Sequence, residues 1–239
     1  MADINVKDIV IKAIDSKTAN LFVKKNHYSG KVVQNSQLHF GAFYNDKLHG
    51  VMSFGASLDK RKTQGLVKGT GWNEFVELNR MAFDDFLPKN SESRSISIAI
   101  KLIKKHAPQI KWIISFADAT QCGDGTIYRA SGFVLVGIKA NKQIIEFPDG
   151  TKDTRMLLSD PSRPARRNEL AKKYGITLGG GSTVKPFIDF GAKYLAGFQL
   201  KYVYFIDKTY QTKLTVPIAS FSEIEKMGAK MYKGVSYAK

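Results

Sequence analysis

Residues 112–133 read WIISFADATQCGDGTIYRASGF, and this stretch decides the fold. It opens with an uninterrupted apolar run, Trp112 to Ala117, which is typical of a parallel strand buried on both faces. Asp118 ends the run, and the residues from Gly125 to Ser131 predict a short helix that Gly132 stops. Because strands that alternate with helices build α/β sheets, the stretch predicts an α/β fold with Asp118 at the end of a central strand.

The residues around this stretch predict a mixed sheet flanked by helices. Apolar residues recur with helical spacing between Ile96 and Ile103, and Ser91 with Glu92 is a good helix start, so we expect a helix that ends near His106. The other elements expected up to residue 158 are a strand at 6–14, a helix at 16–25, a hairpin of strands at 38–44 and 48–54, a flexible surface loop at 55–71, and strands at 75–83, 133–138 and 143–147.

The C-terminal part has a different character. The segment SRPARRNELAKKYG at 162–175 predicts a basic amphipathic helix, and FSEIEKMGAKMYKG at 221–234 predicts a short helix with a basic tail. Strands are expected at 200–206 and 214–218. This part is short and rich in charge, so we predict one domain at 1–158 and a basic extension at 159–239 that packs on it.

The charge of the chain points to a polyanionic partner. Its 239 residues include 37 Lys and Arg against 21 Asp and Glu, which gives a net charge of +16. Residues 151–239 alone carry 16 basic and 7 acidic side chains, a net charge of +9. Contact with nucleic-acid phosphates is the commonest use of such an excess. A generally basic cytosolic protein is the alternative.

The composition excludes several classes of protein. The single cysteine rules out a disulfide scaffold and fits a reducing compartment. No run approaches the ~18 apolar residues of a membrane span, and the N-terminal residues MADINVKDIV lack the layout of a signal peptide. We therefore expect a globular cytoplasmic protein that does not contact a membrane.

Several common catalytic motifs are missing from the sequence. It contains no Walker loop, no GxGxxG after a strand, no CxxC and no HExxH. Cys122 has no neighbouring histidine in the sequence, so an ordinary thiol is expected there. His27 and Tyr28 stand in a polar loop after a predicted helix. Histidine binds metals and titrates near neutral pH, whereas a helix-terminal histidine beside a packing aromatic is the alternative.

Charged residues in or after apolar strands are further candidates. Glu77 and Arg80 lie in FVELNRMAF, where a charge is costly unless it is paired or solvated at a sheet edge. Asp118 stands where open α/β sheets place chemistry, although Asp also commonly ends strands. Tyr128 lies on the short helix that follows.

The turn PKNSESR at 88–94 is a candidate anion site. Backbone N–H groups at the start of the following helix attract anions, and Ser91, Ser93 and Arg94 add donors. Binding of phosphate or pyrophosphate and a plain helix cap both stay open here.

The order of the predicted elements, with GTIYRASGF near the end, resembles the GNAT acyltransferase fold. More closely, the chain resembles the Mom family of phage DNA-modification proteins from about residue 20 to the C-terminus. The phrases that carry this resemblance are NHYSGKVV, ELNRMAFDD, PKNSESR, ISFAD, GTIYRASGF, FQLKYVYFID, KLTVPI and GAKMYKG. The resemblance implies an α/β, GNAT-like mixed central sheet flanked by helices, with a basic C-terminal extension.

The Mom resemblance also implies a function. It implies an enzyme that converts adenine in DNA to N6-carbamoylmethyladenine, in the host cell cytoplasm, and so protects phage DNA from host restriction. The catalytic residues that it implies, in the domain at 1–158, are His27, Tyr28, Arg80, Asp118 and Tyr128. Iron is the expected cofactor, and the residues that would hold it are His27, Tyr28 and Asp118.

The carbon donor is left open at this point. GNAT enzymes hold the CoA pyrophosphate on a glycine-rich turn, whereas the turn at 88–94 has no glycine, so its side chains obstruct a close backbone approach. Acetyl-CoA and another two-carbon donor are both considered. The residues expected to bind the donor are Ser91, Ser93 and Arg94.

The expected partner is double-stranded DNA with the target adenine flipped out of the stack. Trp72 or Phe86 is a candidate to stack on that base. The basic side chains expected to bind phosphates are Lys60, Arg61, Lys62, Arg163, Arg166 and Arg167. Two alternatives stay open: a non-enzymatic DNA-binding protein on a degenerate GNAT scaffold, and a conventional acetyl-CoA-dependent N-acetyltransferase that acts on an amine.

Overall fold

The computed structural model describes residues 4–162, 164–233 and 235–237. Its centre is a seven-stranded sheet in the order β1-β2-β3-β4-β5-β10-β6. These strands are β1 (Val10–Ala13), β2 (Ser36–Tyr44), β3 (Lys47–Gly55), β4 (Phe75–Phe83), β5 (Trp112–Asp118), β6 (Val134–Ala140) and β10 (Phe198–Phe205). Neighbours from β1 to β4 are antiparallel, whereas β4 and β5 are parallel. The prediction of a mixed α/β sheet is therefore confirmed.

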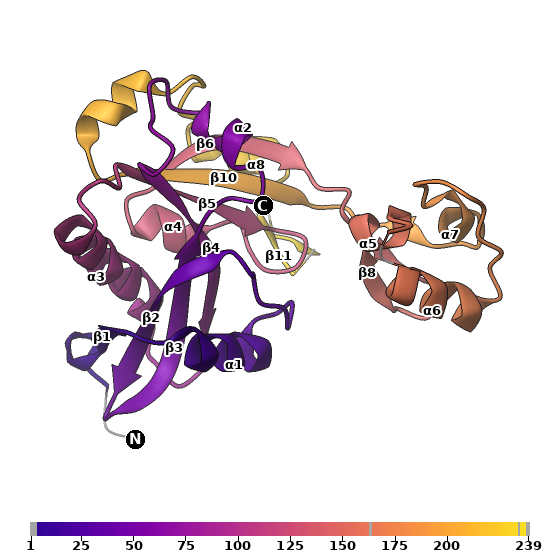
Figure 1. Cartoon of the computed structure of the whole chain (residues 1–239), viewed down its shortest axis with the longest axis horizontal. Helices are drawn as coiled ribbons and strands as arrows, with labels where there is room; N and C mark the ends of the chain where they lie inside the picture. Colours follow the sequence, from indigo (N-terminus) through magenta and orange to yellow (C-terminus); the bar gives the residue numbers. More distant parts are fainter. Residues whose placement is uncertain (1–3, 163, 234, 238–239) are drawn as a thin grey trace. The chain divides into compact units, whose positions relative to one another are not determined.

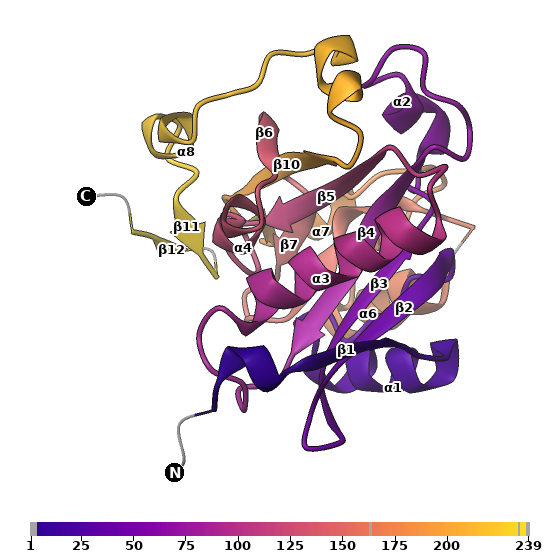
Figure 2. The same cartoon turned by 90° about the vertical axis from the view of Figure 1, so that its left-hand side faces the viewer.

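Two helices cover the two faces of this sheet. α1 (Ser16–Asn26) packs on β2, β3 and β4, and α3 (Ser91–His106) lies on the opposite face (Figures 1 and 2). α3 buries the apolar stripe that the sequence predicts, at Ile96, Ala99, Ile100 and Ile103. Its start differs slightly from the prediction, because Asn90 in a left-handed conformation precedes the helix and its side chain forms no cap.

β4 carries the two irregularities that shape the centre of the sheet. Glu77 is the last residue of β4 that pairs with β5, although both strands continue beyond that point. On the other side of β4, the register with β3 shifts between Leu78 and Arg80, so Asn79 is the extra residue of a β-bulge. Bulges re-aim side chains and are over-represented next to active sites.

The predicted flexible loop at 55–71 is ordered, and that prediction is wrong. α2 (Lys60–Gln64) lies within it, and Leu66 and Val67 are buried in the same apolar cluster as Trp112. The Trp112 ring stacks on that of Phe75, with 4.6 Å between the ring centroids. The base of this loop is therefore part of the hydrophobic core.

Two predicted strands also differ from the structure. No strand forms at 214–218, where Leu214 makes an isolated bridge to Val67, since Pro217 has no N–H to continue a ladder. The strand expected at 6–14 is confined to β1. Residues Val6–Asp8 instead form a short 3-10 helix, in which the Asn5 side chain accepts a hydrogen bond from the Lys7 amide at 2.9 Å.

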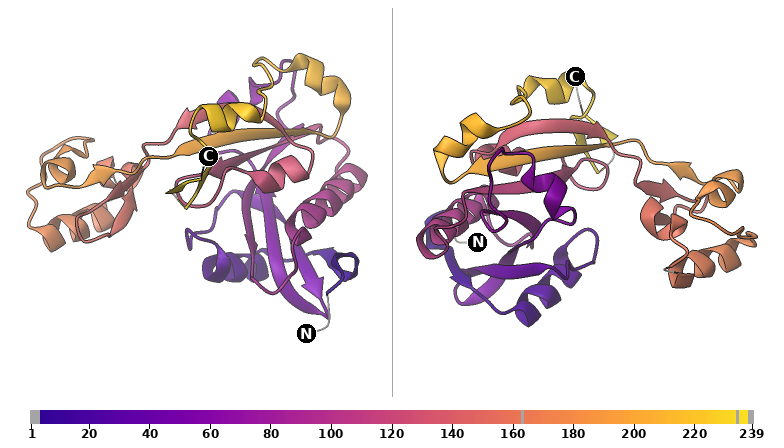
Figure 3. Two further views of the ribbon diagram at one scale, coloured as in Figure 1. Left: turned by 180° about the vertical axis from the view of Figure 1, so that it is seen from behind. Right: turned by 45° about the horizontal axis from the view of Figure 1, so that its top comes forward.

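The chain divides into two compact units. Unit 1 comprises residues 1–117, 125–138 and 200–224, and unit 2 comprises residues 118–124, 139–199 and 225–239. This grouping differs from the predicted boundary after residue 158, because β10 returns to the central sheet between β5 and β6 (Figure 3).

Unit 2 has a core of its own. A three-stranded sheet in the order β8-β7-β9 packs with short helices around buried apolar side chains that include Ile145, Phe147, Leu158, Leu170 and Phe187. The strands are β7 (Ile144–Glu146), β8 (Lys152–Thr154) and β9 (Lys193–Tyr194), and the helices are α5 (Arg155–Ser159), α6 (Pro164–Tyr174) and α7 (Lys185–Asp189).

The remaining elements are short. They are α4 (Thr126–Ala130), a 3-10 helix (Lys208–Lys213), α8 (Ser222–Lys226), β11 (Met231–Tyr232) and β12 (Val235–Ser236). Among the described residues, no helix combines the length and the apolar character that a membrane crossing needs.

Candidate active site

His27 is held at the C-terminal end of α1. The Asp15 side chain caps the start of this helix by accepting a hydrogen bond from the Thr18 amide at 2.9 Å, and His27 is its C-cap residue. The His27 Nδ1 atom lies 2.8 Å from the Ser29 hydroxyl oxygen and 3.1 Å from the Ser29 amide nitrogen. The Ser29 amide can only donate, so Nδ1 accepts this hydrogen bond, and in the neutral imidazole the proton lies on Nε2.

The environment of His27 favours the neutral imidazole. Burial lowers the pKa of His27 to about 4, and the positive charge of Arg80 acts in the same direction. The ring is therefore uncharged at neutral pH, which is the form that binds metals.

Arg80 ties the turn after α1 to the bulge of β4. Its Nε atom donates to the Lys31 carbonyl at 3.0 Å, and its Nη1 atom donates to the Asn79 carbonyl at 2.8 Å. The half-exposed Tyr28 ring lies 4.2 Å from the His27 ring, centroid to centroid. Unit 1 thus brings His27, Tyr28 and Arg80 together.

A buried polar cluster continues from Arg80 along β4. The Asn79 side chain accepts a hydrogen bond from the Ser36 hydroxyl at 3.1 Å and donates to the Ala56 carbonyl at 3.3 Å. Burial raises the pKa of Glu77, whereas the polar groups of Ser57 and Asn79 and the charge of Arg80 oppose that rise. A carboxyl group with a raised pKa binds a proton more readily than an ordinary carboxyl group does.

The substitution Glu77→Gln is expected to stabilise the protein at neutral pH. Since the pKa of Glu77 is higher in the folded than in the unfolded chain, folding loses stability as the pH rises above about 4.5, the ordinary value for glutamate. Glutamine carries no charge and avoids this loss. Thermal unfolding of both proteins between pH 4 and 8 is the measurement, with exposed Asp85→Asn as the control. A melting temperature of Glu77→Gln at or below that of the wild type at neutral pH would contradict the expectation.

Asp118 is the last residue of β5 and belongs to unit 2. Its Oδ1 atom accepts hydrogen bonds from the Thr120 amide at 3.0 Å and from the Asn141 side chain at 3.1 Å. Its Oδ2 atom accepts one from the Gln121 side chain at 2.9 Å. Because a carboxylate offers about four lone-pair sites, the oriented Asp118 keeps capacity for one further ligand.

Tyr128 lies on α4 in unit 1 and is buried. Its ring packs against those of Phe133 and Tyr202, with centroid distances of 5.5 and 5.4 Å. Gly125 precedes the helix with φ 83°, and a Cβ atom there would come within 2.4 Å of the Tyr202 ring. The glycine therefore allows the close approach that forms this aromatic cluster.

The side chains of the turn at 88–94 point to nearby backbone. The Ser91 hydroxyl donates to the Pro88 carbonyl at 2.5 Å, and the Ser93 hydroxyl donates to the Asn90 carbonyl at 3.2 Å. The Arg94 Nη2 atom donates to the Lys7 carbonyl at 3.3 Å, while its buried Nε has no partner among the described residues. These groups thus brace the helix start in the structure.

The predicted phosphate-binding residues fall into two groups. Lys60, Arg61 and Lys62 form most of α2, whereas Arg163 lies outside the described residues. In unit 2, the Arg166 guanidinium pairs with Asp153 and Glu169, with N–O distances of 2.6 Å in both pairs. Buried Arg167 donates to the Leu158 carbonyl at 3.0 Å. The side chains of Arg166 and Arg167 therefore bind partners within unit 2.

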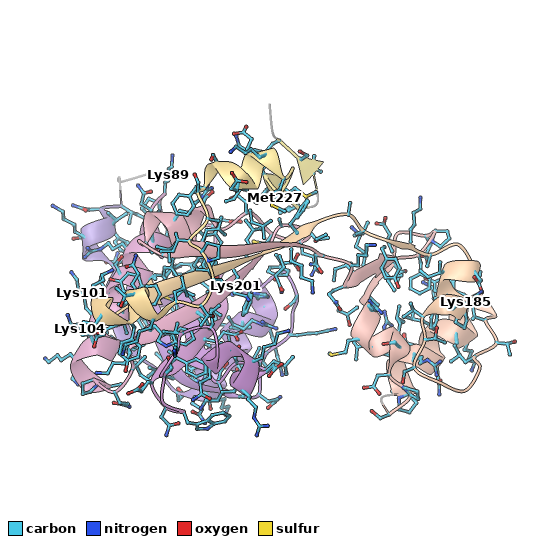
Figure 4. All side chains as sticks on the ribbon, turned by 90° about the horizontal axis from the view of Figure 1, so that it is seen from above. Lys89, Lys101, Lys104, Lys185, Lys201 and Met227 are labelled. Carbon is cyan, nitrogen blue, oxygen red and sulfur yellow. The ribbon has the colours of Figure 1, made fainter. Side chains whose placement is uncertain are left out.

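A second basic surface lies at the C-terminal end of α3. Lys101 and Lys104 project from this helix in Figure 4. A cavity of about 400 Å³ adjoins it, and its lining includes Lys104, Lys111 and Lys208. None of these side chains forms an ion pair with another described residue.

The predicted iron ligands offer suitable donor types. His27 supplies a neutral imidazole and Tyr28 a phenol oxygen in unit 1, and Asp118 supplies an oriented carboxylate in unit 2. Such nitrogen and oxygen donors suit iron. No group of three or more His, Cys, Asp or Glu side chains gathers as a metal site in the part of the chain that the structure describes.

Comparison with known proteins identifies relatives of this chain. The model of the Mom protein family matches residues 8–223. The protein named methylcarbamoylase mom, from Escherichia phage Mu, is 39% identical over 132 residues, which cover 55% of this chain and 54% of that protein. The match thus spans about half the length of this curated relative.

Similar solved structures are acetyltransferases. One is a GNAT family acetyltransferase from Elizabethkingia anophelis, with 11% identity, a TM-score of 0.39 and coverage of 83% of this chain and 99% of that chain. Another is the spermidine/spermine N-acetyltransferase SpeG from Vibrio cholerae, with 8% identity, a TM-score of 0.45 and coverage of 87% and 98%.

Proposed function

This chain belongs to the Mom protein family, and from that premise we propose that it is a phage DNA-modification enzyme that attaches a carbamoylmethyl group to N6 of adenine. The single observation that carries the proposal beyond family membership is the cluster around Arg80. There a neutral histidine, a tyrosine, a partly buried carboxyl group and a guanidinium meet at the β4 bulge. A protein that only binds DNA needs no such cluster.

The reaction joins N6 of adenine to a carbon of the donor and breaks one N6–H bond, while the leaving group departs from that carbon with the bonding electrons. Adenine N6 is a weak nucleophile because its lone pair is delocalised into the ring. Glu77 is proposed to accept the released proton, since burial makes this carboxylate bind a proton more readily. Tyr128 is proposed to orient the donor or to move a proton.

Arg80 is proposed to bind a carboxylate or phosphate of the donor. Its Nε and Nη1 atoms hold Lys31 and Asn79, which leaves Nη2 with N–H donors for a ligand. His27, Tyr28 and Asp118 are proposed to hold iron, which supplies Lewis-acid or redox activation of the donor when it is bound. The donor itself, whether acetyl-CoA or another two-carbon compound, is not assigned.

Double-stranded DNA is the proposed substrate. The net charge of +16 and the basic side chains of α2 and α3 support contacts with phosphates. The adenine must leave the duplex to reach a cluster at the centre of a sheet. The proposed consequence of the modification is resistance of the DNA to host restriction.

Restriction digestion tests this function. DNA from cells that produce the protein is expected to resist endonucleases whose sites contain adenine. DNA from cells that produce the double variant His27→Ala, Asp118→Ala is expected to be cut. Complete cleavage of both DNAs, with both proteins soluble, would contradict the proposal and favour a binding protein without activity. Turnover of acetyl-CoA on a simple amine would instead favour a conventional N-acetyltransferase.

The iron site gives a separate prediction. The substitution His27→Ala is expected to weaken iron binding at least ~10-fold, since even changes around metal ligands cost 10–100-fold in affinity. Elemental analysis after loading with ferrous iron and gel filtration is the measurement. His106→Ala, which removes an exposed histidine at the end of α3, is the control. An equal iron content in the wild type and in His27→Ala would show that His27 is not an iron ligand.

A further inference from the structure

We propose that Leu58 is a wedge that enters the base stack beside the target adenine. It lies in the connection between β3 and β4, residues 56–74, which we call the platform. This inference rests on the proposed function, because a wedge has a role only if a base leaves the duplex. It assigns a position in the DNA complex to a side chain that the chemistry itself does not use.

The platform exposes two large apolar side chains. Leu58 is 91% exposed, the highest value among the large apolar residues of the described chain, and Trp72 is 51% exposed. A single exposed leucine is common on protein surfaces and indicates nothing by itself. The basic surroundings of Leu58 and its attachment to the candidate site distinguish this leucine from the others.

Basic residues follow Leu58 closely in the sequence. Asp59 caps the start of α2, and the next three residues are Lys60, Arg61 and Lys62. The Lys60 ammonium group lies 4.5 Å from the centre of the Trp72 ring. None of the three basic side chains forms an ion pair with a described residue. Proteins that unstack DNA combine apolar wedges with cationic side chains that bind the adjacent phosphates.

The base of the platform is rigid. The Thr70 hydroxyl accepts a hydrogen bond from the Trp112 indole at 3.1 Å, and the Thr70 carbonyl accepts one from the Gln64 side chain at 2.7 Å. The Lys68 amide donates to the Lys213 carbonyl at 2.8 Å. A wedge on a rigid support loses little conformational entropy on binding, so more of the contact energy is left to separate the bases.

The platform is also joined to the candidate site. The Ala56 carbonyl accepts hydrogen bonds from the side chains of Asn79 and Asn35, and buried Ser57 faces Glu77. Two residues of extended chain span at most ~7 Å, so Leu58 stands close to the point where Ala56 meets the β4 bulge. A base displaced by Leu58 would therefore leave the duplex next to the cluster of Glu77 and Arg80.

Fluorescence of 2-aminopurine tests the wedge without any donor or metal. This adenine analogue brightens when it leaves the stack, and a set of duplexes places it between every pair of flanking bases. Wild-type protein is expected to raise the fluorescence of at least one duplex, and Leu58→Ala is expected to reduce that rise about 10-fold. Duplex affinity is expected to change less than about 3-fold, because the phosphate contacts of α2 are intact.

Two controls separate the wedge from a general loss of structure. Leu21→Ala removes another exposed leucine, on α1, and is expected to match the wild type. When the base opposite 2-aminopurine is replaced by an abasic site, the target unstacks at low cost, and Leu58→Ala is expected to recover the wild-type signal. If the fluorescence signal of Leu58→Ala did not recover, the defect would lie in the fold of the platform, and the proposal of a wedge would be contradicted.

The outcomes also separate the wedge from the proposed function. If wild type and Leu58→Ala raise the fluorescence equally, the wedge is overturned while DNA modification stands. If the wild type raises the fluorescence of no duplex, base flipping fails, and with it both the wedge and the proposed route of adenine to the site.

Discussion

Replacement of Arg80 by alanine is expected to reduce DNA modification at least ~100-fold, since loss of one positioned donor in an active site costs on the order of 10²–10³ in rate. The guanidinium has two tasks in the structure. It fixes the turn after α1 through the Lys31 carbonyl, and it helps to keep the neighbouring His27 ring uncharged. Both are lost in Arg80→Ala. The amount of modified adenosine per unit of soluble protein is the measurement.

A conservative variant and a matched control are needed to interpret this result. Arg80→Lys keeps a positive charge but cannot hold Lys31 and Asn79 together through one planar group, so it is also expected to be strongly impaired. Arg155→Ala removes an exposed arginine of α5 in unit 2 and is the matched control. Modification by Arg80→Ala at the level of Arg155→Ala would show that the cluster on β4 is not the active site.

Replacement of Asp118 by asparagine is expected to have an effect of similar size. The side-chain oxygen of the new amide can still accept the hydrogen bonds from Thr120 and Asn141, so the turn after β5 should persist, although the hydrogen bond from Gln121 is lost. The negative charge that favours a metal ion is lost, however. We expect iron affinity to fall at least ~10-fold, as for changes at other metal sites, and modification to fall with it.

Asn141→Ala is the companion variant for this prediction. It removes a hydrogen bond to Asp118 while it keeps the carboxylate, so its iron affinity and its activity are expected to fall less than those of Asp118→Asn. Circular dichroism and thermal unfolding check that both variants are folded. Full iron content and full modification in Asp118→Asn would contradict the placement of Asp118 among the metal ligands.

The regular elements could be predicted because their residues repeat with a clear period. The strand predicted at 75–83 is β4, and the apolar run from Trp112 is β5. Local sequence patterns indicate both strands, because their apolar residues follow one another or alternate. The platform could not be predicted in the same way. Its glycines and basic residues indicate a flexible loop, whereas its order comes from Trp112 and Lys213, which lie far away in the sequence.

The candidate site was predictable in its residue types but not in its connections. The sequence singles out Arg80 as a charge in an apolar strand, but it does not show that the partners of Arg80 are backbone carbonyls. The bulge at Asn79 depends on the register between β3 and β4, which no local sequence pattern indicates. Arg166 and Arg167 appear as a basic cluster in the sequence, yet the structure directs both toward partners within unit 2.

Mass spectrometry of nucleosides tests the central claim most directly. Genomic DNA from bacteria that produce the protein would be digested and compared with DNA from cells that produce the double variant His27→Ala, Asp118→Ala. The account predicts a new deoxyadenosine species that is heavier by one carbamoylmethyl group in the first sample and absent from the second. Unmodified deoxyadenosine in both samples, with soluble wild-type protein present, would contradict it.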